Sequence, residues 1–271
     1  MHHSLKMLLL IGLAFIVWLP LLVVIFTSFK TRAEIATAVP TLLPQTFTFD
    51  NYARLFRLMR FEVYLWNSLL VASLTAAISL LVSSLAAYAL VWLRFKGKRI
   101  FQGFTLFVYL FPQILLVVPL FLMCYRLGLL DTKFALVLTY LAFILPFGIW
   151  MLKNYFESIS RTLVDAALVD GCTYWQCLWR VVLPVCLPGL ATVLTYSFIL
   201  GWNEYMFASI LISSNPSRTV AIGVQTLIGN HGTDFTLLTA AAVVMIIPTL
   251  IFFMFIQRWF IEGLTLGGSQ D

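Results

Sequence analysis

Long stretches without a charged residue constrain this chain more than any other feature. A bilayer core of about 30 Å needs roughly 20 apolar residues of helix. Six stretches reach that length: Met7–Phe29, Val63–Leu93, Ile100–Tyr125, Phe134–Leu152, the run from Arg180 to Arg218 that only Glu204 interrupts, and Phe235–Gln257. We therefore predict an all-α integral membrane protein with six transmembrane helices.

The composition supports this class and excludes several others. Hydrophobic residues make up 62% of the chain and charged residues 10%, whereas a soluble domain is about half apolar and a quarter charged. A soluble globular protein, a disordered chain, a disulfide scaffold and a nucleic-acid binder are therefore excluded. The net charge of +6 favours anionic lipid headgroups as its counterpart. We expect the four cysteines to be free thiols.

The positions of these uncharged stretches also predict the organisation of the chain. Residues 1–62 form a first transmembrane helix and an outer loop, residues 63–257 a membrane core, and residues 258–271 a C-terminal tail. The first helix is expected to be retained, because its uncharged run is longer than the core of a signal peptide and lacks a small-residue cleavage site. Positive charges divide almost evenly between the two sides, but the dense cluster from Arg94 to Arg99 favours cytoplasmic termini. Pro112, Pro119 and Pro248 are expected to kink their helices.

The connection at about residues 153–184 has its own predicted structure. Thr162 with Asp165 resembles a capping box that begins a helix over residues 163–169. Gly171 then supplies the left-handed residue that ends this helix. Thr173 with Gln176 forms a second capping box, and the helix that it opens is expected to close at Pro184.

This second helix has an apolar stripe. Trp175, Trp179 and Val182 fall at positions i, i+4 and i+7, which lie on one helix face. The stripe is consistent with a helix that rests on the lipid interface, and equally with a docking element for a soluble partner.

The same segment resembles a known motif. Asp165-Ala166-Ala167, three residues, Gly171, nine residues and then Val181-Val182-Leu183-Pro184 is similar to the EAA loop of binding-protein-dependent ABC importer membrane subunits. Asp165 stands where the family has glutamate, and Val181 where it has isoleucine. Further fragments resemble the carbohydrate-uptake branch, and above all the second membrane subunit of maltose-type transporters; they are Asn67-Ser68, 87–90, 95–97, 119–121, 127–132, 202–205 and 263–265.

The resemblance implies a fold, a function and partners. The fold is the type I ABC importer transmembrane domain, and the chain is a permease subunit that forms half of the pore for a carbohydrate or polyol. Its implied location is the bacterial inner membrane, and its implied partners are a second permease, a dimer of ATPase subunits and an external solute-binding protein. The ATPase-coupling residues are Asp165, Ala166, Ala167, Asp170, Gly171, Leu183 and Pro184.

The chain itself is not expected to be an enzyme. An ATP-binding loop of the Gly-x-x-x-x-Gly-Lys-Ser/Thr type is missing from the sequence, since Gly97-Lys98-Arg99 lacks both the first glycine and the hydroxyl. ATP and Mg²⁺ are therefore expected on the partner ATPase subunits, and neither a cofactor nor a metal is expected in this chain. The sequence also has no recognisable spacing of catalytic or metal-ligating residues.

A second candidate site lies where the fifth apolar run contains its acid. An ionised carboxylate within a span is costly, so Glu204 is expected to face a polar cavity or a partner. Asn203 and Glu204 are candidates to bind sugar hydroxyls, and Trp202 or Tyr205 to stack on a sugar face. The same residues are equally consistent with a polar helix cap or with a contact to the sister subunit.

Two other functions remain alternatives. A self-contained secondary transporter predicts an internal repeat, interrupted helices in pairs or several acids within the spans, and Glu204 is the only acid in the six apolar runs. A membrane scaffold without transport activity leaves the motif at 165–184 unexplained.

Overall fold

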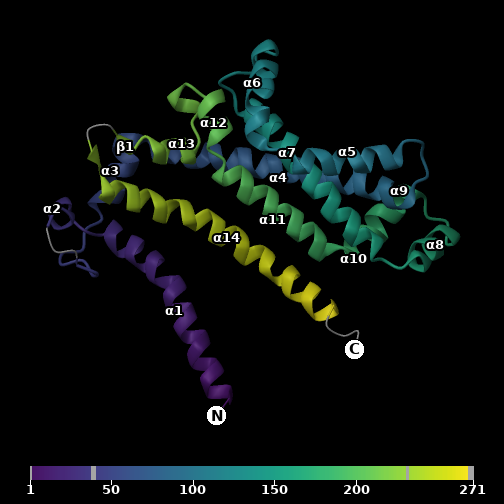
Figure 1. Ribbon diagram of the computed structural model, residues 1–271, viewed down its shortest axis with the longest axis horizontal. Helices are drawn as coiled ribbons and strands as arrows, with labels where there is room; N and C mark the ends of the chain where they lie inside the picture. The colour runs from purple at the N-terminus through teal and green to yellow at the C-terminus, as the bar shows by residue number, and fades with distance from the viewer. Residues whose placement is uncertain (1, 38–40, 230–231, 268–271) are drawn as a thin grey trace. The chain divides into compact units, whose positions relative to one another are not determined.

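The computed structural model describes residues 2–37, 41–229 and 232–267, and these residues are almost entirely helical (Figure 1). The elements before residue 160 are α1 (His2–Ser28), α2 (Arg32–Ile35), α3 (Asp50–Met59), α4 (Phe61–Trp92), α5 (Lys98–Leu110), η1 (Gln113–Leu116), α6 (Val117–Arg126) and α7 (Lys133–Glu157). Those after it are α8 (Arg161–Val169), α9 (Tyr174–Cys177), η2 (Leu178–Val182), α10 (Leu183–Val185), α11 (Leu187–Asn203), α12 (Met206–Leu211), η3 (Asn215–Ser217), α13 (Val220–Gln225), β1 (Ile228–Gly229), β2 (Gly232–Thr233) and α14 (Phe235–Gly267).

The predicted all-α class is confirmed, with one small addition. The strands β1 and β2 pair antiparallel, with Ile228 opposite Thr233 and Gly229 opposite Gly232. This two-residue ladder sits in the loop before α14. At the other end, α14 continues to Gly267, beyond the last residue of the predicted sixth span.

The helices account for the six predicted membrane crossings. Among the described residues, four stretches of single helix are long and apolar enough to span a bilayer: Leu10–Ser28, Phe61–Trp92, Lys133–Glu157 and Phe235–Gln257. Two pairs of helices with a sharp bend are together as long and apolar: α5 with η1 and α6 (100°), and α9 to α10 with α11 (83°). Six crossings follow when each bent pair counts as one.

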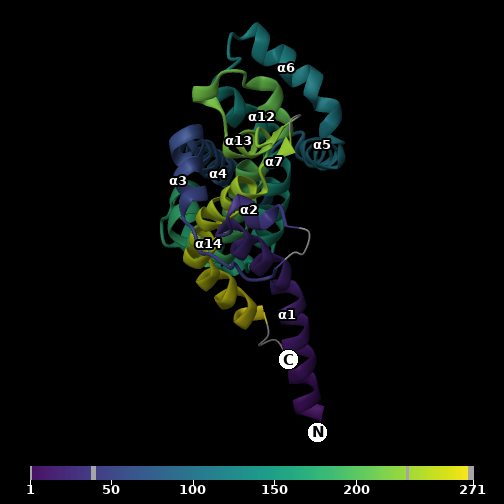
Figure 2. The ribbon, with the colours of Figure 1, turned by 90° about the vertical axis from the view of Figure 1, so that its left-hand side faces the viewer.

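The expectation of a kinked but continuous helix over Ile100–Tyr125 is wrong. The chain breaks at Phe111-Pro112, where Phe111 adopts an extended conformation (φ −74°, ψ 131°) before the proline. A proline disfavours the helical conformation of the residue before it and lacks the N–H that would continue the ladder. Figure 2 shows the resulting turn between α5 and α6. Pro119 and Pro248, in contrast, lie inside helices α6 and α14.

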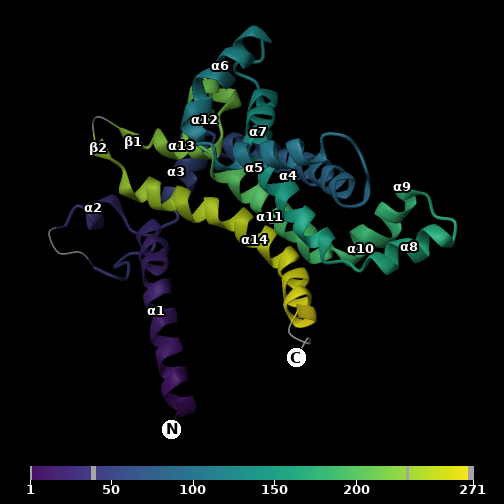
Figure 3. The same cartoon turned by 45° about the vertical axis from the view of Figure 1, so that its right-hand side comes forward.

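The chain divides into two compact units. The first contains residues 1–65 and 219–249, and the second contains residues 66–218 and 250–271. In the second unit α7 packs against both α5 and α11, and Figures 1 and 3 show α11 beside α7.

Small residues allow the close helix packing in the second unit. A Cβ on Gly148 of α7 would lie 2.4 Å from the Ser83 Oγ atom of α4, and a Cβ on Gly201 of α11 would lie 3.3 Å from the Ala72 Cα atom. The buried Ser197 hydroxyl also donates to the Ser79 hydroxyl at 3.1 Å. Close backbone approach and hydrogen bonds between helices are the main sources of packing energy inside a membrane.

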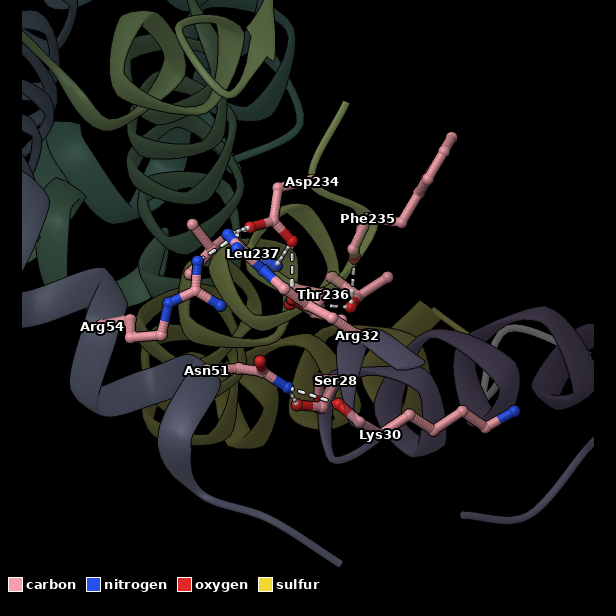
Figure 4. Close-up of polar contacts among 10 residues, drawn as sticks. Ser28, Lys30, Arg32, Asn51, Arg54, Asp234, Phe235, Thr236 and Leu237 are labelled. Carbon is pink, nitrogen blue, oxygen red and sulfur yellow. Dashed lines mark hydrogen bonds and ion pairs between the residues drawn. The ribbon is translucent and has the colours of Figure 1, made fainter. Parts of the chain in front are cut away.

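The first unit is held together by polar contacts at the ends of its helices (Figure 4). The Asn51 side-chain amide donates to the carbonyl oxygens of Ser28 (2.9 Å), the last residue of α1, and of Lys30 (2.8 Å), two residues further on. Asp234, just before α14, forms ion pairs with Arg32 and with Arg54, the latter at 2.9 Å. The cluster therefore ties α1, α2 and α3 to the start of α14.

The electrostatics of Asp234 follow from these contacts. Partial burial raises the pKa of the carboxyl group, but hydrogen bonds from the Thr236 hydroxyl and from the two arginines outweigh that effect. The net result is a pKa well below the usual value. Asp234 is therefore a charged anchor throughout the physiological pH range.

Candidate functional site

Helix α8 carries the first part of the motif and begins earlier than predicted. Ser160 is the N-cap residue, with an extended backbone (φ −58°, ψ 129°), and Arg161 is the first helical residue. The predicted capping box of Thr162 with Asp165 is wrong, because Thr162 already lies inside the helix and its hydroxyl contacts that of Ser160 at 2.6 Å. Ser160 holds the N-cap position, but its side chain makes no capping hydrogen bond to the helix. Asp165 consequently lies in the second turn.

The turn after α8 is confirmed as predicted. Gly171 has φ +89°, the left-handed conformation that glycine adopts without a steric penalty. Its N–H donates to the Leu168 carbonyl at 3.1 Å, and the Cys172 N–H donates to the Ala167 carbonyl at 3.0 Å. This pair of bonds defines a Schellman motif, which satisfies the last carbonyl groups of the helix.

The capping box at Thr173 is also confirmed. The Gln176 N–H donates to the Thr173 hydroxyl oxygen at 3.2 Å, and the Thr173 N–H donates to the Gln176 side-chain oxygen at 2.8 Å. Two backbone N–H groups at the start of α9 thus find acceptors in the side chains of Thr173 and Gln176. The turn between the two helices is therefore fixed at both ends by its own residues.

The prediction that Pro184 closes this helix is wrong. The chain stays helical through α9, the π-helical turn η2 and α10, and it breaks only at Cys186 (φ −96°, ψ 20°). In η2 the Leu183 N–H donates to the Leu178 carbonyl, five residues back. Because proline has no N–H and its ring clashes with the carbonyl four residues earlier, the wider π turn accommodates Pro184 where a regular α-helix would not.

The segment from α8 to α10 is anchored on a buried apolar cluster. Val164, Leu178 and Val182 are at most 1% exposed and pack with Leu152 and Phe156 of α7. The Tyr88 hydroxyl of α4 donates to the Tyr174 carbonyl at 2.8 Å. Figure 3 shows the group of short helices at one end of α7 and α11. We therefore treat α8 to α10 as a rigid extension of the second unit.

The motif residues divide between the surface and this anchor. The exposed ones are Asp165, Ala166, Asp170, Gly171 and Pro184, while Ala167 is half-buried and Leu183 is buried. Val169, which directly precedes Asp170, is 87% exposed although it is apolar. The exposed motif residues thus come from α8 and the turn after it, except for Pro184, which lies in α10.

The predicted apolar stripe is not a single face. Trp175 and Trp179 are 60% and 45% exposed, with ring centroids 5.7 Å apart, while Val182 is fully buried. A π turn contains more residues than an α turn, so η2 rotates Val182 away from the two tryptophans. The tryptophan pair is therefore an exposed aromatic surface beside the motif.

The second candidate site lies at the end of α11, and its four residues have different surroundings. Trp202 is 1% exposed and stacks on Phe198 at 5.9 Å, so it presents no free ring face for a sugar. The Glu204 carboxylate accepts hydrogen bonds from the backbone N–H groups of Phe207 (2.7 Å) and Ala208 (3.0 Å). It therefore caps α12, the polar helix cap that the sequence allowed.

The other two residues of this site are exposed. The Asn203 side-chain amide donates to the Ile199 carbonyl at 2.9 Å, and Tyr205 is 42% exposed. Asn203 and Tyr205 are thus the exposed members of the predicted set.

Asp131 and Asn67 make contacts that sequence reasoning did not foresee. The Asp131 carboxylate accepts from the N–H groups of Ser213 (3.0 Å) and Ser214 (2.9 Å), and the hydrogen bond from Ser214 is the main reason why its pKa lies below the usual value. The Asn67 amide donates to the carbonyls of Pro216 and Arg218. Together they fix the loop after α12. The only signal was that both residues lie in fragments resembling the carbohydrate-uptake branch.

Metal binding has no support in the described part of the chain. Among those residues, no group of three or more His, Cys, Asp or Glu side chains is arranged to hold a metal ion.

These features define a multi-pass helical membrane protein with a rigid helical projection that carries an exposed acidic motif. Residues 79–265 match the family described as "Binding-protein-dependent transport system inner membrane component", and the chain belongs to this family. It is accordingly a membrane permease subunit of an ABC importer, which confirms the resemblance drawn from the motif.

Individual relatives are similar over nearly their whole length. The chain is 37% identical to "Inner membrane ABC transporter permease protein YcjP" of Escherichia coli (strain K12), over 93% of this chain and 90% of the relative. It is 35% identical to "Trehalose/maltose transport system permease protein MalG" of Thermococcus litoralis, over 98% and 97%. In structure it is similar to a chain of a bacterial ABC transporter involved in the import of the acidic polysaccharide alginate, with a TM-score of 0.82, 26% identity and 96% coverage of both chains.

Proposed function

We propose that this chain forms half of the translocation pore of an importer for a carbohydrate or related polyol, and that α8 to α10 couple the pore to cytoplasmic ATPase subunits. The carbohydrate class is supported by the trehalose/maltose and alginate systems in which its relatives act. A secondary transporter and a scaffold are both less favoured, since neither accounts for the family match over residues 79–265.

The single observation that carries the coupling proposal is the placement of the motif. Asp165, Ala166, Asp170 and Gly171 are exposed, yet the segment that bears them is anchored on fully buried side chains such as Val182. A rigid projection transmits a rigid-body displacement to the helices behind it, whereas a flexible loop would absorb the displacement. Asp165 and Asp170 offer charges to basic groups of a partner, and Ala166 permits close approach.

The remaining parts of the assembly follow from this role. The partners are a second permease subunit, a dimer of ABC ATPase subunits that bind ATP and Mg²⁺, and an external solute-binding protein. Residues 153–184 and both termini, including the tail from 258 to 271, then face the cytoplasm. The segment 1–62 supplies the first helix and an outer loop, and residues 63–257 supply the core of the transporter.

A charge placed at the proposed interface tests the coupling. We expect Ala166→Glu to weaken binding of the ATPase subunits at least tenfold, because an exposed alanine at an interface core is replaced by a bulky like charge beside Asp165. The matched control is Ser158→Glu, an exposed position outside α8, because a residue one turn away on α8 would share the face of Ala166. Co-purification of the complex from membranes measures both variants. Equal retention of the ATPase by the Ala166→Glu variant and the wild type would exclude α8 as the docking helix.

For the solute path, we propose Asn203 and Tyr205 as the contacting residues, and Glu204 as the cap that positions them. Tyr205→Ala removes an exposed ring, and we expect it to reduce solute-stimulated ATP hydrolysis severalfold, since the aromatic face on which a sugar ring packs is lost. Ser209→Ala is the control, because its exposed hydroxyl contacts only the Met206 carbonyl. An unchanged stimulation in the Tyr205→Ala variant would remove this residue from the path.

A further inference from the structure

A cleft beside the motif helix is not explained by the coupling role. It has a volume of about 1140 Å³, slightly above the usual range for small-molecule sites. One wall is the end of α4 and the loop that follows it, and the other wall is α8 with Tyr174. The lining includes Val91, Trp92, Arg94, Lys98, Arg161 and Asp165. All of them belong to the second compact unit.

The charges in this cleft are mostly positive and lack ion-pair partners. Arg94, Lys98 and Arg161 face a single acid, Asp165. The ion pairs found among the described residues are Arg32 and Arg54 with Asp234, and Lys153 with Glu157, so none involves the cations of the cleft. Within the described part of the chain, the three cations make one side-chain hydrogen bond, a long one from the Lys98 ammonium group to the Val91 carbonyl at 3.5 Å. Three unpaired cations at one cleft favour an anionic ligand.

The rest of the wall is apolar and aromatic. Val91 and the Trp92 ring line the cleft, and Trp92 packs between Tyr88 (5.2 Å) and Phe156 (5.7 Å). The indole N–H of Trp92 is buried without a hydrogen-bond partner in the described part of the chain. Tryptophan at the end of a spanning helix is typical of the membrane interface. Cationic and apolar walls therefore meet where a spanning helix leaves the bilayer.

We propose that this cleft binds one anionic phospholipid, whose phosphate is held by Arg94, Lys98 and Arg161 and whose glycerol and upper acyl carbons lie against Val91 and Trp92. Basic pockets between membrane helices are suited to such headgroups. The bound lipid bridges α4 and α8, and so braces the helix that carries Asp165. The assignment rests on the proposed function for its statement that this end of α4 faces the cytoplasmic leaflet.

The test uses the whole complex in detergent, titrated with phosphatidylglycerol or with phosphatidylcholine of the same acyl chains, with retained lipid counted by native mass spectrometry. The lining variant is Arg94→Gln with Arg161→Gln. The matched control is Lys96→Gln with Arg99→Gln, which removes two nearby cations, one from the loop after α4 and one from the first turn of α5, that do not line the cleft. Each lining cation is expected to contribute about fivefold in affinity. We therefore expect the lining pair to bind phosphatidylglycerol about 25-fold more weakly, and the control pair to change less than threefold.

Several results would overturn the assignment. An equal loss of phosphatidylglycerol affinity in the lining pair and the control pair would mean that the lipid is attracted diffusely to the charged surface. The absence of saturable phosphatidylglycerol binding to the wild type would mean that there is no site. Competition by excess inorganic phosphate alone would assign the cleft to a free anion. Loss of the ATPase from the lining variant with unchanged lipid binding would assign the cleft to a segment of that subunit. Because the titration measures lipid and not transport, the lipid site and the coupling proposal fail independently of each other.

Discussion

Replacing Gly171 with proline gives a sharp test of how the coupling segment works. Gly171 has φ +89°, whereas proline is locked near −65°. The substitution also removes the N–H that donates to Leu168, and it disfavours the helical conformation of Asp170 (φ −71°, ψ 5°) directly before it. The Schellman motif is therefore incompatible with proline at this position.

The size of the effect follows from these losses. Proline at an incompatible position costs about 3 kcal/mol or more, which lowers the population of the native turn roughly a hundredfold. When only the native turn is competent to bind, the affinity for the ATPase falls by the same factor. Gly171→Asn is the control, because asparagine tolerates the left-handed region and keeps the N–H. Its expected loss is about fivefold.

The assay is titration of the detergent-solubilised permease pair with purified ATPase subunits, with immunoblots of membranes to measure insertion. We expect both variants to insert normally, since Gly171 is exposed and a Cβ placed there meets no atom within 4 Å. An affinity within threefold of the wild type for Gly171→Pro, with normal insertion, would refute the view that this turn positions the docking surface.

Two further predictions concern the anchors outside the motif. Asp131→Ala should lower the stability of the folded chain by about 1–3 kcal/mol, because two backbone N–H groups lose their acceptor; Asp131→Asn keeps an acceptor oxygen, and thermal melting in detergent should rank it between the alanine variant and the wild type. The pKa of Asp234 is lower in the folded chain than in the unfolded chain, where an aspartate has a pKa of about 3.9. Its ion pairs therefore contribute their full stabilisation of the folded chain above about pH 3.9, and this stabilisation is lost as the pH falls through the lower pKa of the folded chain. Melting temperatures of the wild type should therefore decline on acidification below about pH 4, and an equal decline in Asp234→Asn would remove Asp234 as the cause.

The local features of the coupling segment were accessible from sequence because each is encoded within a few residues. Gly171 ends a helix through bonds to Leu168 and Ala167, and Thr173 caps one through Gln176. Such motifs depend on backbone geometry and not on distant contacts. The membrane crossings were predictable for a similar reason, since the apolar length is set by the bilayer.

What the sequence did not predict depends on tertiary packing. Pro184 remains inside a helix because a π turn accommodates it and because Leu178 and Val182 beside it are buried. Asp131 finds its partners 82 and 83 residues further along the chain. Trp202 is covered by Phe198, although its place next to polar residues suggested an exposed ring. A local deviation from regular helix decides the outcome for Pro184, neighbours distant in the sequence decide it for Asp131, and a residue one turn earlier on α11 decides it for Trp202.

The two candidate sites are physically connected through one packed body. The buried residues under the coupling segment include Leu152 and Phe156 of α7 and Val193 of α11. Helix α7 packs along α11, and α11 ends at Asn203, directly before the Glu204 carboxylate that caps α12. Close-packed interiors shift between discrete arrangements and do not deform continuously. A displacement imposed on α8 is therefore expected to move α7 and α11 as rigid elements, and to carry Asn203 and Tyr205 with them. Such a linkage requires no flexible element between the motif and the proposed solute path.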